Sequence, residues 1–201
     1  MLEMKPWGNG KEYPKVFAVG ESDLILHLRS GNAKALRAFL SKEPQWLTYW
    51  YHGDSLLHMA AENDYPDVLA VLVELGLDVN TQCQKVPWGA LETSVQRGYL
   101  SSARWLLEHG AKTTYEYRGL TFCCGTLWSV ASGNFEMVKL LVEHGAPVDI
   151  LVDDPPRGLL TEAIGGGYTE IADYLRSKGA LTDEEIKRRA KGATKPRKSK
   201  K

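Results

Sequence analysis

The sequence predicts an all-α fold, a solenoid of stacked antiparallel helical hairpins joined by β-turn or loop fingers. Three observations predict it: residues 54–76 have the pattern of a helical hairpin, its marker residues return at a fixed interval, and buried pairs keep one register. A chain of 201 residues is long enough to bury about 70% of its unfolded surface. We expect one domain, because stacked repeats share a continuous core.

The best hairpin begins at Ser55, a predicted helix N-cap whose hydroxyl can accept an unpaired backbone N–H. It ends at Gly76, where a helix C-terminus favours a left-handed residue. The apolar stripe of its short first helix is Leu57, Ala60 and Ala61. The second helix repeats apolar residues as a helix buried on one side does, at Val68, Leu69, Leu72 and Val73.

Two marker positions recur along the chain at intervals of 34, 35 and 34 residues. The glycines that end the second helices are Gly76, Gly110, Gly145 and Gly179. The turns between the two helices are Asp64, Gly98, Gly133 and Gly167. The buried pairs in the same register are Leu72–Val73, Leu106–Leu107 and Leu141–Val142. Agreement at both positions indicates a repeat architecture.

The stretch Asp54-Ser55-Leu56-Leu57-His58-Met59-Ala60-Ala61 resembles the ankyrin repeat pattern Gly-x-Thr-Pro-Leu-His-x-Ala-Ala. The alternative is another helical-hairpin repeat, which the spacing and the Gly-Ala endings disfavour. The resemblance makes His58 the structural histidine that ties neighbouring loops together. Glu92 replaces that histidine in the next repeat, so the tie is expected to be lost there.

The resemblance divides the chain into about five repeats between an N-terminal lead-in and a C-terminal extension. The predicted segments are the lead-in 1–20, a repeat domain 21–181 with repeats at about 21–50, 51–84, 85–119, 120–153 and 154–181, and a short helix with a basic tail at 182–201. The first repeat is divergent and the last carries Arg176 at an apolar position, as expected of caps. Thr182 and Glu185 have capping-box spacing, which predicts a helix from 183 to about 191.

Two aromatic regions each allow two interpretations. In the lead-in, Trp7, Tyr13 and Phe17 either cover the first repeat or belong to a disordered end. The cluster Trp46, Tyr49, Trp50 and Tyr51 either fills the irregular junction between the first two repeats or anchors a partner.

The neutral composition conceals a division of charge. The chain has 25 basic and 25 acidic residues, but nine of the cations follow position 186 and no acid does, so the body has 16 basic against 25 acidic residues, a net charge of −9. An acidic body favours basic partners and argues against nucleic acid as its ligand. The tail is either a solubilising extension or a localisation signal or phosphate-binding arm, the one place where nucleic acid could bind.

No sequence motif suggests catalysis. The chain lacks His-Glu-x-x-His, Gly-x-Ser-x-Gly and phosphate-loop patterns, and Gly165–Gly167 falls where an inter-helix turn is expected. The spacing of Cys83, Cys123 and Cys124 does not match a closed zinc site, and an odd number of cysteines favours a reducing compartment. No apolar run of 18 residues is present. We therefore expect a cytoplasmic, monomeric, non-enzymatic protein with no cofactor, metal, small-molecule substrate or membrane contact.

In ankyrin folds, partners usually meet the fingers and the exposed side of the first helices. The resemblance assigns that role to Tyr51, His52, Asp54, Glu62, Asn63, Trp88, Gln96, Arg97, Tyr115, Glu116, Tyr117, Arg118, Phe122, Asp153, Asp154 and Arg157. Trp88 and the aromatic finger 115–122 are the expected anchors. The alternative is that these rings pack on one another and stiffen the loops.

The function expected is a protein–protein interaction module that binds, and inhibits or sequesters, a basic partner. One version follows from a resemblance to small bacterial ankyrin proteins that act as immunity proteins against toxins. The alternative is an adaptor whose basic tail directs localisation or contacts nucleic acid.

Overall fold

The computed structural model describes residues 21–117, 120–149, 151–152 and 157–193. The described residues are mostly helical, arranged as antiparallel pairs with short strands between them, which confirms the all-α ankyrin-type solenoid. The chain divides into two compact units, residues 1–117 and 118–201, and each is described by itself. The predicted limits of the individual repeats stay predictions.

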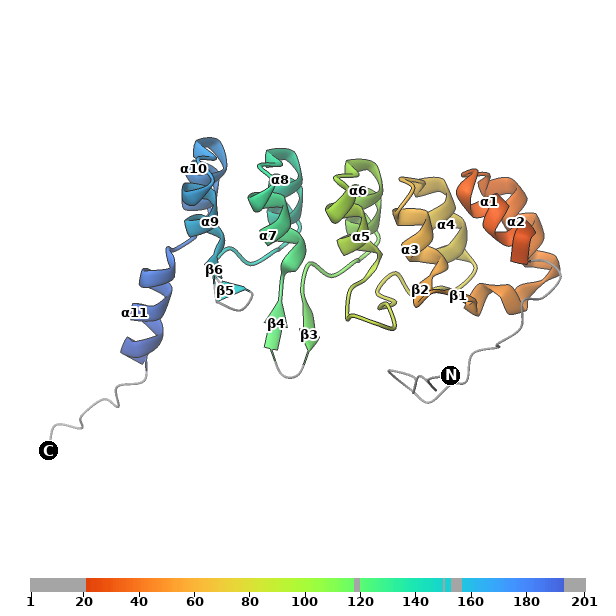
Figure 1. The fold of residues 1–201 in the computed structure, drawn as a ribbon, viewed down its shortest axis with the longest axis horizontal. Coiled ribbons are helices and arrows are strands. Elements are labelled where there is room, and N and C mark those ends of the chain that lie inside the picture. Colours follow the sequence, from red (N-terminus) through yellow and green to blue (C-terminus); the bar gives the residue numbers. More distant parts are fainter. Residues whose placement is uncertain (1–20, 118–119, 150, 153–156, 194–201) are drawn as a thin grey trace, which may run out of the picture. The chain divides into compact units, whose positions relative to one another are not determined.

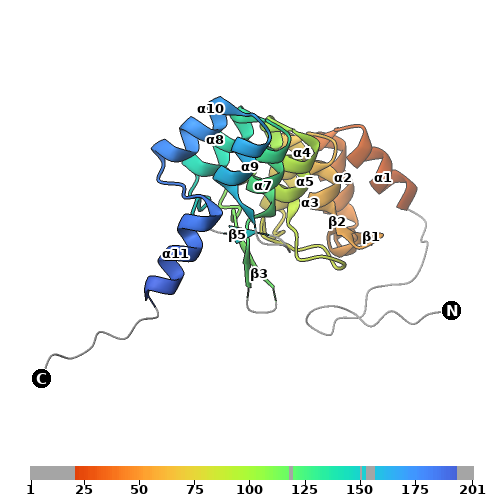
Figure 2. The ribbon, with the colours of Figure 1, turned by 60° about the vertical axis from the view of Figure 1, so that its left-hand side comes forward.

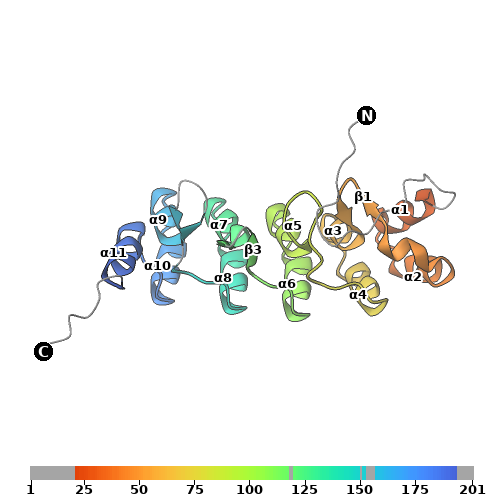
Figure 3. The same cartoon turned by 90° about the horizontal axis from the view of Figure 1, so that it is seen from below.

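In the first unit, three helical hairpins stand side by side (Figure 1). Their helices are α1 (Glu21–Arg29), α2 (Ala33–Lys42), α3 (Leu56–Ala61), α4 (Pro66–Glu74), α5 (Ala90–Arg97) and α6 (Leu100–Glu108). Helices α1, α3 and α5 form one layer, and α2, α4 and α6 form the other (Figure 3). Between the layers lie fully buried leucines, including Leu24, Leu36, Leu57, Leu72 and Leu106.

The junction between the first two hairpins is irregular, as the missing glycine at the end of α2 predicts. The helix is followed by a 3₁₀ turn, η1 (Pro44–Thr48), and then by two short antiparallel strands, β1 (Trp50–Tyr51) and β2 (Asp54–Ser55). Trp46 is buried in this turn, with its ring centroid 6.5 Å from that of Phe39 and 5.3 Å from that of Tyr49. Trp46 therefore fills the junction, while Tyr49, Trp50 and Tyr51 are half-buried.

Local signals in the sequence fix the helix ends. Ser55 is the N-cap of α3, as predicted, and its hydroxyl lies 2.8 Å from Nδ1 of His58. Gly76, Gly110, Gly145 and Gly179, predicted to end the second helices, all have positive φ. The predicted inter-helix turns also hold left-handed residues: Asp64 has φ of 56°, and Gly98, Gly133 and Gly167 have φ of 70–75°.

The second unit has the same design. It contains β4 (Leu120–Phe122), α7 (Cys124–Ala131), α8 (Phe135–Glu143), β5 (Leu151–Val152), β6 (Arg157–Gly158), α9 (Leu159–Gly165) and α10 (Thr169–Ser177). Helices α7 and α9 pack in one layer and α8 and α10 in the other, while β5 and β6 pair antiparallel. Its core includes Leu127, Val138, Leu160 and Leu175, and the predicted core residue Leu141 is 1% exposed.

A tyrosine ring covers an inter-helix glycine at one junction in each unit. A Cβ on Gly31 would lie 2.9 Å from the ring of Tyr65, and one on Gly133 would lie 2.5 Å from the ring of Tyr168. Each tyrosine hydroxyl also donates to a carbonyl of the preceding hairpin, that of Arg29 and that of Ala131. A side chain at either glycine would displace the ring, so these positions require glycine for space as well as for φ.

The predicted helix after the last repeat is present as α11 (Asp183–Ala193), which continues past residue 191 (Figure 2). Its capping box is formed: Glu185 Oε2 accepts the Thr182 N–H at 2.8 Å. Asp183 attaches the helix to α9, since its carboxylate accepts the Gly158 N–H at 2.7 Å and its own N–H donates to Thr161 Oγ1 at 3.1 Å.

Candidate protein-binding surface

His58 ties the second repeat to the loop that precedes α5. Its side chain is 3% exposed. Nδ1 accepts the Ser55 N–H at 3.3 Å, so Nε2 carries the proton and donates to the Trp88 carbonyl at 3.0 Å. Burial lowers the pKa of His58, while the Trp88 carbonyl and the Asp54 carboxylate act in the opposite direction. The imidazole is therefore neutral and joins two successive loops.

Glu92 occupies the matching position 34 residues later, in α5. Its Oε2 accepts the Gly89 N–H at 2.9 Å, which satisfies a backbone donor at the start of its own helix. The side chain is only 4% exposed, and burial raises the pKa of its carboxyl to about 7, against the lowering effect of the Gly89 and Glu92 amides. The carboxylate thus caps its own helix, as expected if the inter-loop tie is lost here.

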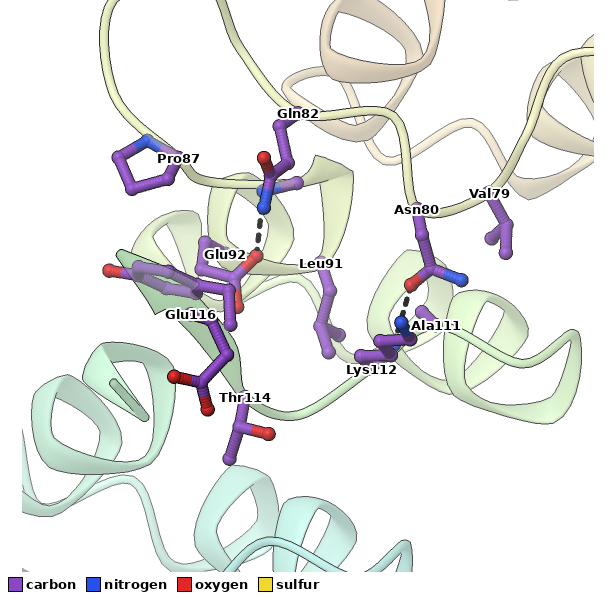
Figure 4. Close-up of a pocket in the computed structure, with 12 residues that line it drawn as sticks. Val79, Asn80, Gln82, Pro87, Leu91, Glu92, Ala111, Lys112, Thr114 and Glu116 are labelled. Carbon is purple, nitrogen blue, oxygen red and sulfur yellow. Dashed lines mark hydrogen bonds between the residues drawn. The ribbon is translucent and has the colours of Figure 1, made fainter. Parts of the chain in front are cut away.

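A cavity of about 370 Å³ lies beside Glu92, entirely within the first unit. Figure 4 shows its lining, which comes from the loop between α4 and α5, from the start of α5, and from the loop that leads into β3 (Tyr115–Tyr117). Asn80 links two of these loops: its Oδ1 accepts the Lys112 N–H at 2.9 Å and its Nδ2 donates to the Gly110 carbonyl at 3.1 Å.

The structure brings some of the predicted partner-binding residues to this cavity. Tyr115, half-buried, and Glu116, exposed, both line it. Pro87 and Gly89, on either side of Trp88, line it as well, but Trp88 does not. The Trp88 carbonyl accepts bonds from His58 and from the Cys83 N–H at 2.7 Å, and its side chain is half-buried. The Trp88 backbone carbonyl therefore has a structural role, which does not depend on the ring.

The other predicted residues of the first unit lie along its loops and the ends of its first helices. His52 is exposed with φ of 53°, and its ring centroid is 4.4 Å from that of the half-buried Tyr51. Asp54 is half-buried. Glu62, Asn63, Gln96 and Arg97 are exposed, and Glu62 pairs with Arg97 across two repeats. Together with Trp88, Tyr115 and Glu116, these residues form what we call the loop surface of the first unit.

In the second unit, Phe122 is half-buried. Arg118, Asp153 and Asp154 lie outside the described residues, as do the side chains of Tyr117 in β3 and Arg157 in β6.

Sequence reasoning missed Glu92, Asn80, Gln82 and Lys112 as residues that line a cavity next to the predicted surface. The available signal was the substitution at 92, a charged residue at a position that the repeat pattern keeps inside. Among the described residues, no group of three or more His, Cys, Asp or Glu side chains is arranged to hold a metal ion. No helix in the described part of the chain is long and apolar enough to cross a membrane.

Comparison with known proteins agrees with this geometry. Models of the ankyrin repeat match residues 52–81 and 126–153. Ankyrin repeat protein FPV014 of fowlpox virus is 27% identical over 142 residues, which is 71% of this chain and 32% of that protein. Glycerophosphocholine phosphodiesterase gde1 of Schizosaccharomyces pombe is 27% identical over 168 residues, which is 83% of this chain and 14% of that protein.

The chain thus spans less than a third of the length of either relative, and the activity in the second name belongs to that protein. Ankyrin repeats are a non-enzymatic fold for protein–protein interaction. The recurring left-handed turns, the buried His58 tie and the two matching repeat models lead to one conclusion: this chain is an ankyrin repeat protein.

Proposed function

We propose that the chain binds a basic partner protein through the loop surface of its first unit, and that it inhibits or sequesters that partner by covering it. The observation that carries the proposal is charge: an interaction fold whose body has 25 acidic residues against 16 basic ones attracts basic proteins and speeds their encounter. Exposed Glu62 and Glu116 lie on the loop surface itself.

Affinity capture with the full chain at low and high salt tests the proposal. A basic protein should be recovered at low salt, and its affinity should fall as salt rises, because exposed charges are screened over about 10 Å at 0.1 M salt. Recovery of no basic protein, or of a complex insensitive to salt, would count against the proposal.

A matched pair of charge reversals locates the surface. Glu116→Lys changes an exposed acid on the loop surface, and Glu108→Lys changes an exposed acid on α6. We expect Glu116→Lys to weaken the complex several-fold, chiefly through slower association, and Glu108→Lys to leave it unchanged. Equal effects of the two variants would remove this surface from consideration.

Trp88→Ala decides between anchoring and stiffening. If the ring anchors a partner, affinity should fall by about 2 kcal/mol while the melting temperature barely moves. If the ring is structural, the melting temperature should fall first, and affinity should follow only through unfolding.

One narrower version of the function rests on sequence alone. A toxin neutralised by stoichiometric binding is one basic partner of the proposed class, and an adjacent toxin gene or rescue from a co-expressed toxin would test that version. We also propose that the chain is a cytoplasmic monomer; the odd number of cysteines, three, favours a reducing compartment. Sedimentation and fractionation test both statements.

A second candidate is an adaptor whose basic extension contacts nucleic acid or directs localisation. The observation in its favour is that α11 carries the exposed cations Lys187, Arg188 and Arg189. Two of them already have partners, since Arg188 pairs with Glu184 and Arg189 pairs with Asp149. Deleting residues 187–201 without changing localisation or nucleic-acid affinity would end this alternative.

A further inference from the structure

We infer that the cavity beside Glu92 receives one cationic side chain, a lysine or an arginine, from the partner protein, with the Glu92 carboxylate as its counter-ion. The inference rests on the proposed function, because it names the group of a basic partner that this chain recognises.

The Glu92 carboxyl group is buried and lines the cavity. The Gly89 N–H occupies Oε2, and no ion pair within the described part of the chain includes Glu92. The Glu92 side chain is only 4% exposed, and burying an ionised carboxylate without a cation costs free energy. A charged donor arriving in the cavity would supply the missing partner.

The other charged and titratable groups that line the cavity are Lys112, Glu116 and Tyr115. Lys112 is exposed and, in Figure 4, lies beside Asn80 and Ala111, with Leu91 between it and Glu92. It is not among the causes that shift the pKa of Glu92. Glu116, at the exposed edge of the cavity, adds a second negative charge. Lys112, the one lysine or arginine among the lining residues, is thus not the counter-ion of Glu92.

The walls of the cavity fit a lysine or arginine side chain. Val79, Pro87, Leu91 and Tyr115 supply apolar surface, and Gln82 and Thr114 supply polar groups. Lysine and arginine need this combination, because their methylene stems lie along apolar surface while their charged ends seek oxygen atoms. A tyrosine ring also attracts a cation near its face. At about 370 Å³, the cavity lies within the range of specific ligand pockets.

The test uses the full chain and defined probes: N-acetyl-arginine amide and N-acetyl-lysine amide, compared with the neutral N-acetyl-citrulline amide, all at constant ionic strength. Nuclear magnetic resonance follows the titration of the Glu92 carboxyl carbon and the chemical shift of the Gly89 amide. A cationic probe should lower the apparent pKa of Glu92 and move the Gly89 signal, and citrulline should do neither. Equal responses to charged and neutral probes, or no response to any, would overturn the inference.

Two variants remove the site in different ways. Glu92→Gln keeps the acceptor for Gly89 but removes the charge, so the Gly89 signal should no longer respond to the cationic probes. Gln82→Lys changes an exposed residue and places a cation at the cavity, so the Glu92 pKa should fall and the probes should be excluded. Glu108→Gln, at an exposed carboxylate on α6 that does not line the cavity, is the matched control and should respond as the unchanged chain does.

A comparison of peptides separates a protein partner from a small amine. The arginine placed within a neutral pentapeptide should bind at least as well as the single amino-acid amide. Binding of agmatine with exclusion of the pentapeptide would identify the occupant as a small molecule and overturn the inference.

Binding of the captured partner to variants of the chain distinguishes failure of this inference from failure of the proposed function. Glu92→Gln should weaken a basic partner at least tenfold, with Glu108→Gln, at an exposed acid on α6, as control. If a basic partner binds both variants equally well, the cavity inference fails and the proposed function stands. If the probes bind at Glu92 but no basic protein is captured, the proposed function fails while the cavity retains its preference for cations.

Discussion

Positions 58 and 92 occupy the same register of neighbouring repeats, yet the two side chains connect to different parts of the molecule. His58 bonds to Ser55 on one side and to the Trp88 carbonyl, in the next loop, on the other. Glu92 bonds to Gly89 in its own repeat and borders a cavity. Both are buried, at 3% and 4% exposure, so burial does not explain the difference.

The difference comes from hydrogen-bond chemistry. A neutral imidazole accepts at one nitrogen and donates at the other, so it can bridge an amide and a carbonyl. An ionised carboxylate only accepts, so it can satisfy the Gly89 N–H but cannot donate to a carbonyl in a neighbouring loop. A change of residue type at one position therefore replaces a tie between repeats with a cap inside one repeat and a buried titratable carboxyl group.

The largest expected effect is the loss of stability on truncating equivalent core leucines, and it tests whether neighbouring repeats share one register. Leu72 and Leu106 are equivalent core positions, each 0% exposed, and changing either to Ala should cost about 2–5 kcal/mol of unfolding free energy. Chemical denaturation measures this, with Leu26→Ala, at a side chain 61% exposed, as the control. A cost under about 1 kcal/mol at both positions would mean that the register is wrong.

Glu92→Gln should change the pH dependence of stability. The folded carboxyl has a pKa of about 7 against an ordinary 4.5, so between these values the folded chain holds a proton that the unfolded chain releases. Stability should therefore fall as pH rises through this window, by about 3 kcal/mol at most.

Glutamine does not titrate, so the stability of the Glu92→Gln variant should not fall over this pH range. The variant should therefore be more stable than the unchanged chain at pH 8. Urea denaturation at pH 5 and pH 8 measures the difference, with Glu62→Gln as the exposed control. A variant that is equally pH-dependent would show that Glu92 is not the titrating group.

His58→Ala should cost about 2 kcal/mol at pH 7, because it removes the bridge between Ser55 and the Trp88 carbonyl. Amide hydrogen exchange should rise in the loop 77–89 as that tie is lost. His109→Ala, at an exposed ring stacked on Trp105, is the matched control and should change little. Unchanged exchange in the loop would contradict the role given to His58.

The smallest expected effect concerns a second tie between the same two repeats. Asp64, with φ of 56°, accepts the Ser102 N–H of α6 at 2.9 Å. Asp64→Ala should cost about 1–2 kcal/mol by losing this cap and placing alanine at a left-handed φ. Asp64→Asn keeps an acceptor and tolerates that φ, so its melting temperature should lie close to that of the unchanged chain. An equal loss of stability in the Ala and Asn variants would show that neither the cap nor the left-handed φ accounts for it.

Much of the fold follows from local pattern. The glycines at 76, 110, 145 and 179, the cap at Ser55 and the capping box at Thr182 each depend on residues a few positions apart, and all were predictable. The surface was harder to predict. Tyr115 and Glu116 were identified in the sequence, but their cavity also needs Val79 and Gln82, which come from another loop.

The sequence by itself determined the helical hairpins, their period and their buried leucines, because helix periodicity and left-handed turns are encoded within single repeats. Tertiary structure alone decided that Asp64 caps a helix of the next repeat, that Trp46 fills a junction, and that the Glu92 carboxylate is buried beside a cavity. The physical reason is that burial and hydrogen bonding at these residues depend on groups supplied by other segments, and a pattern read along one chain does not record which groups packing brings together.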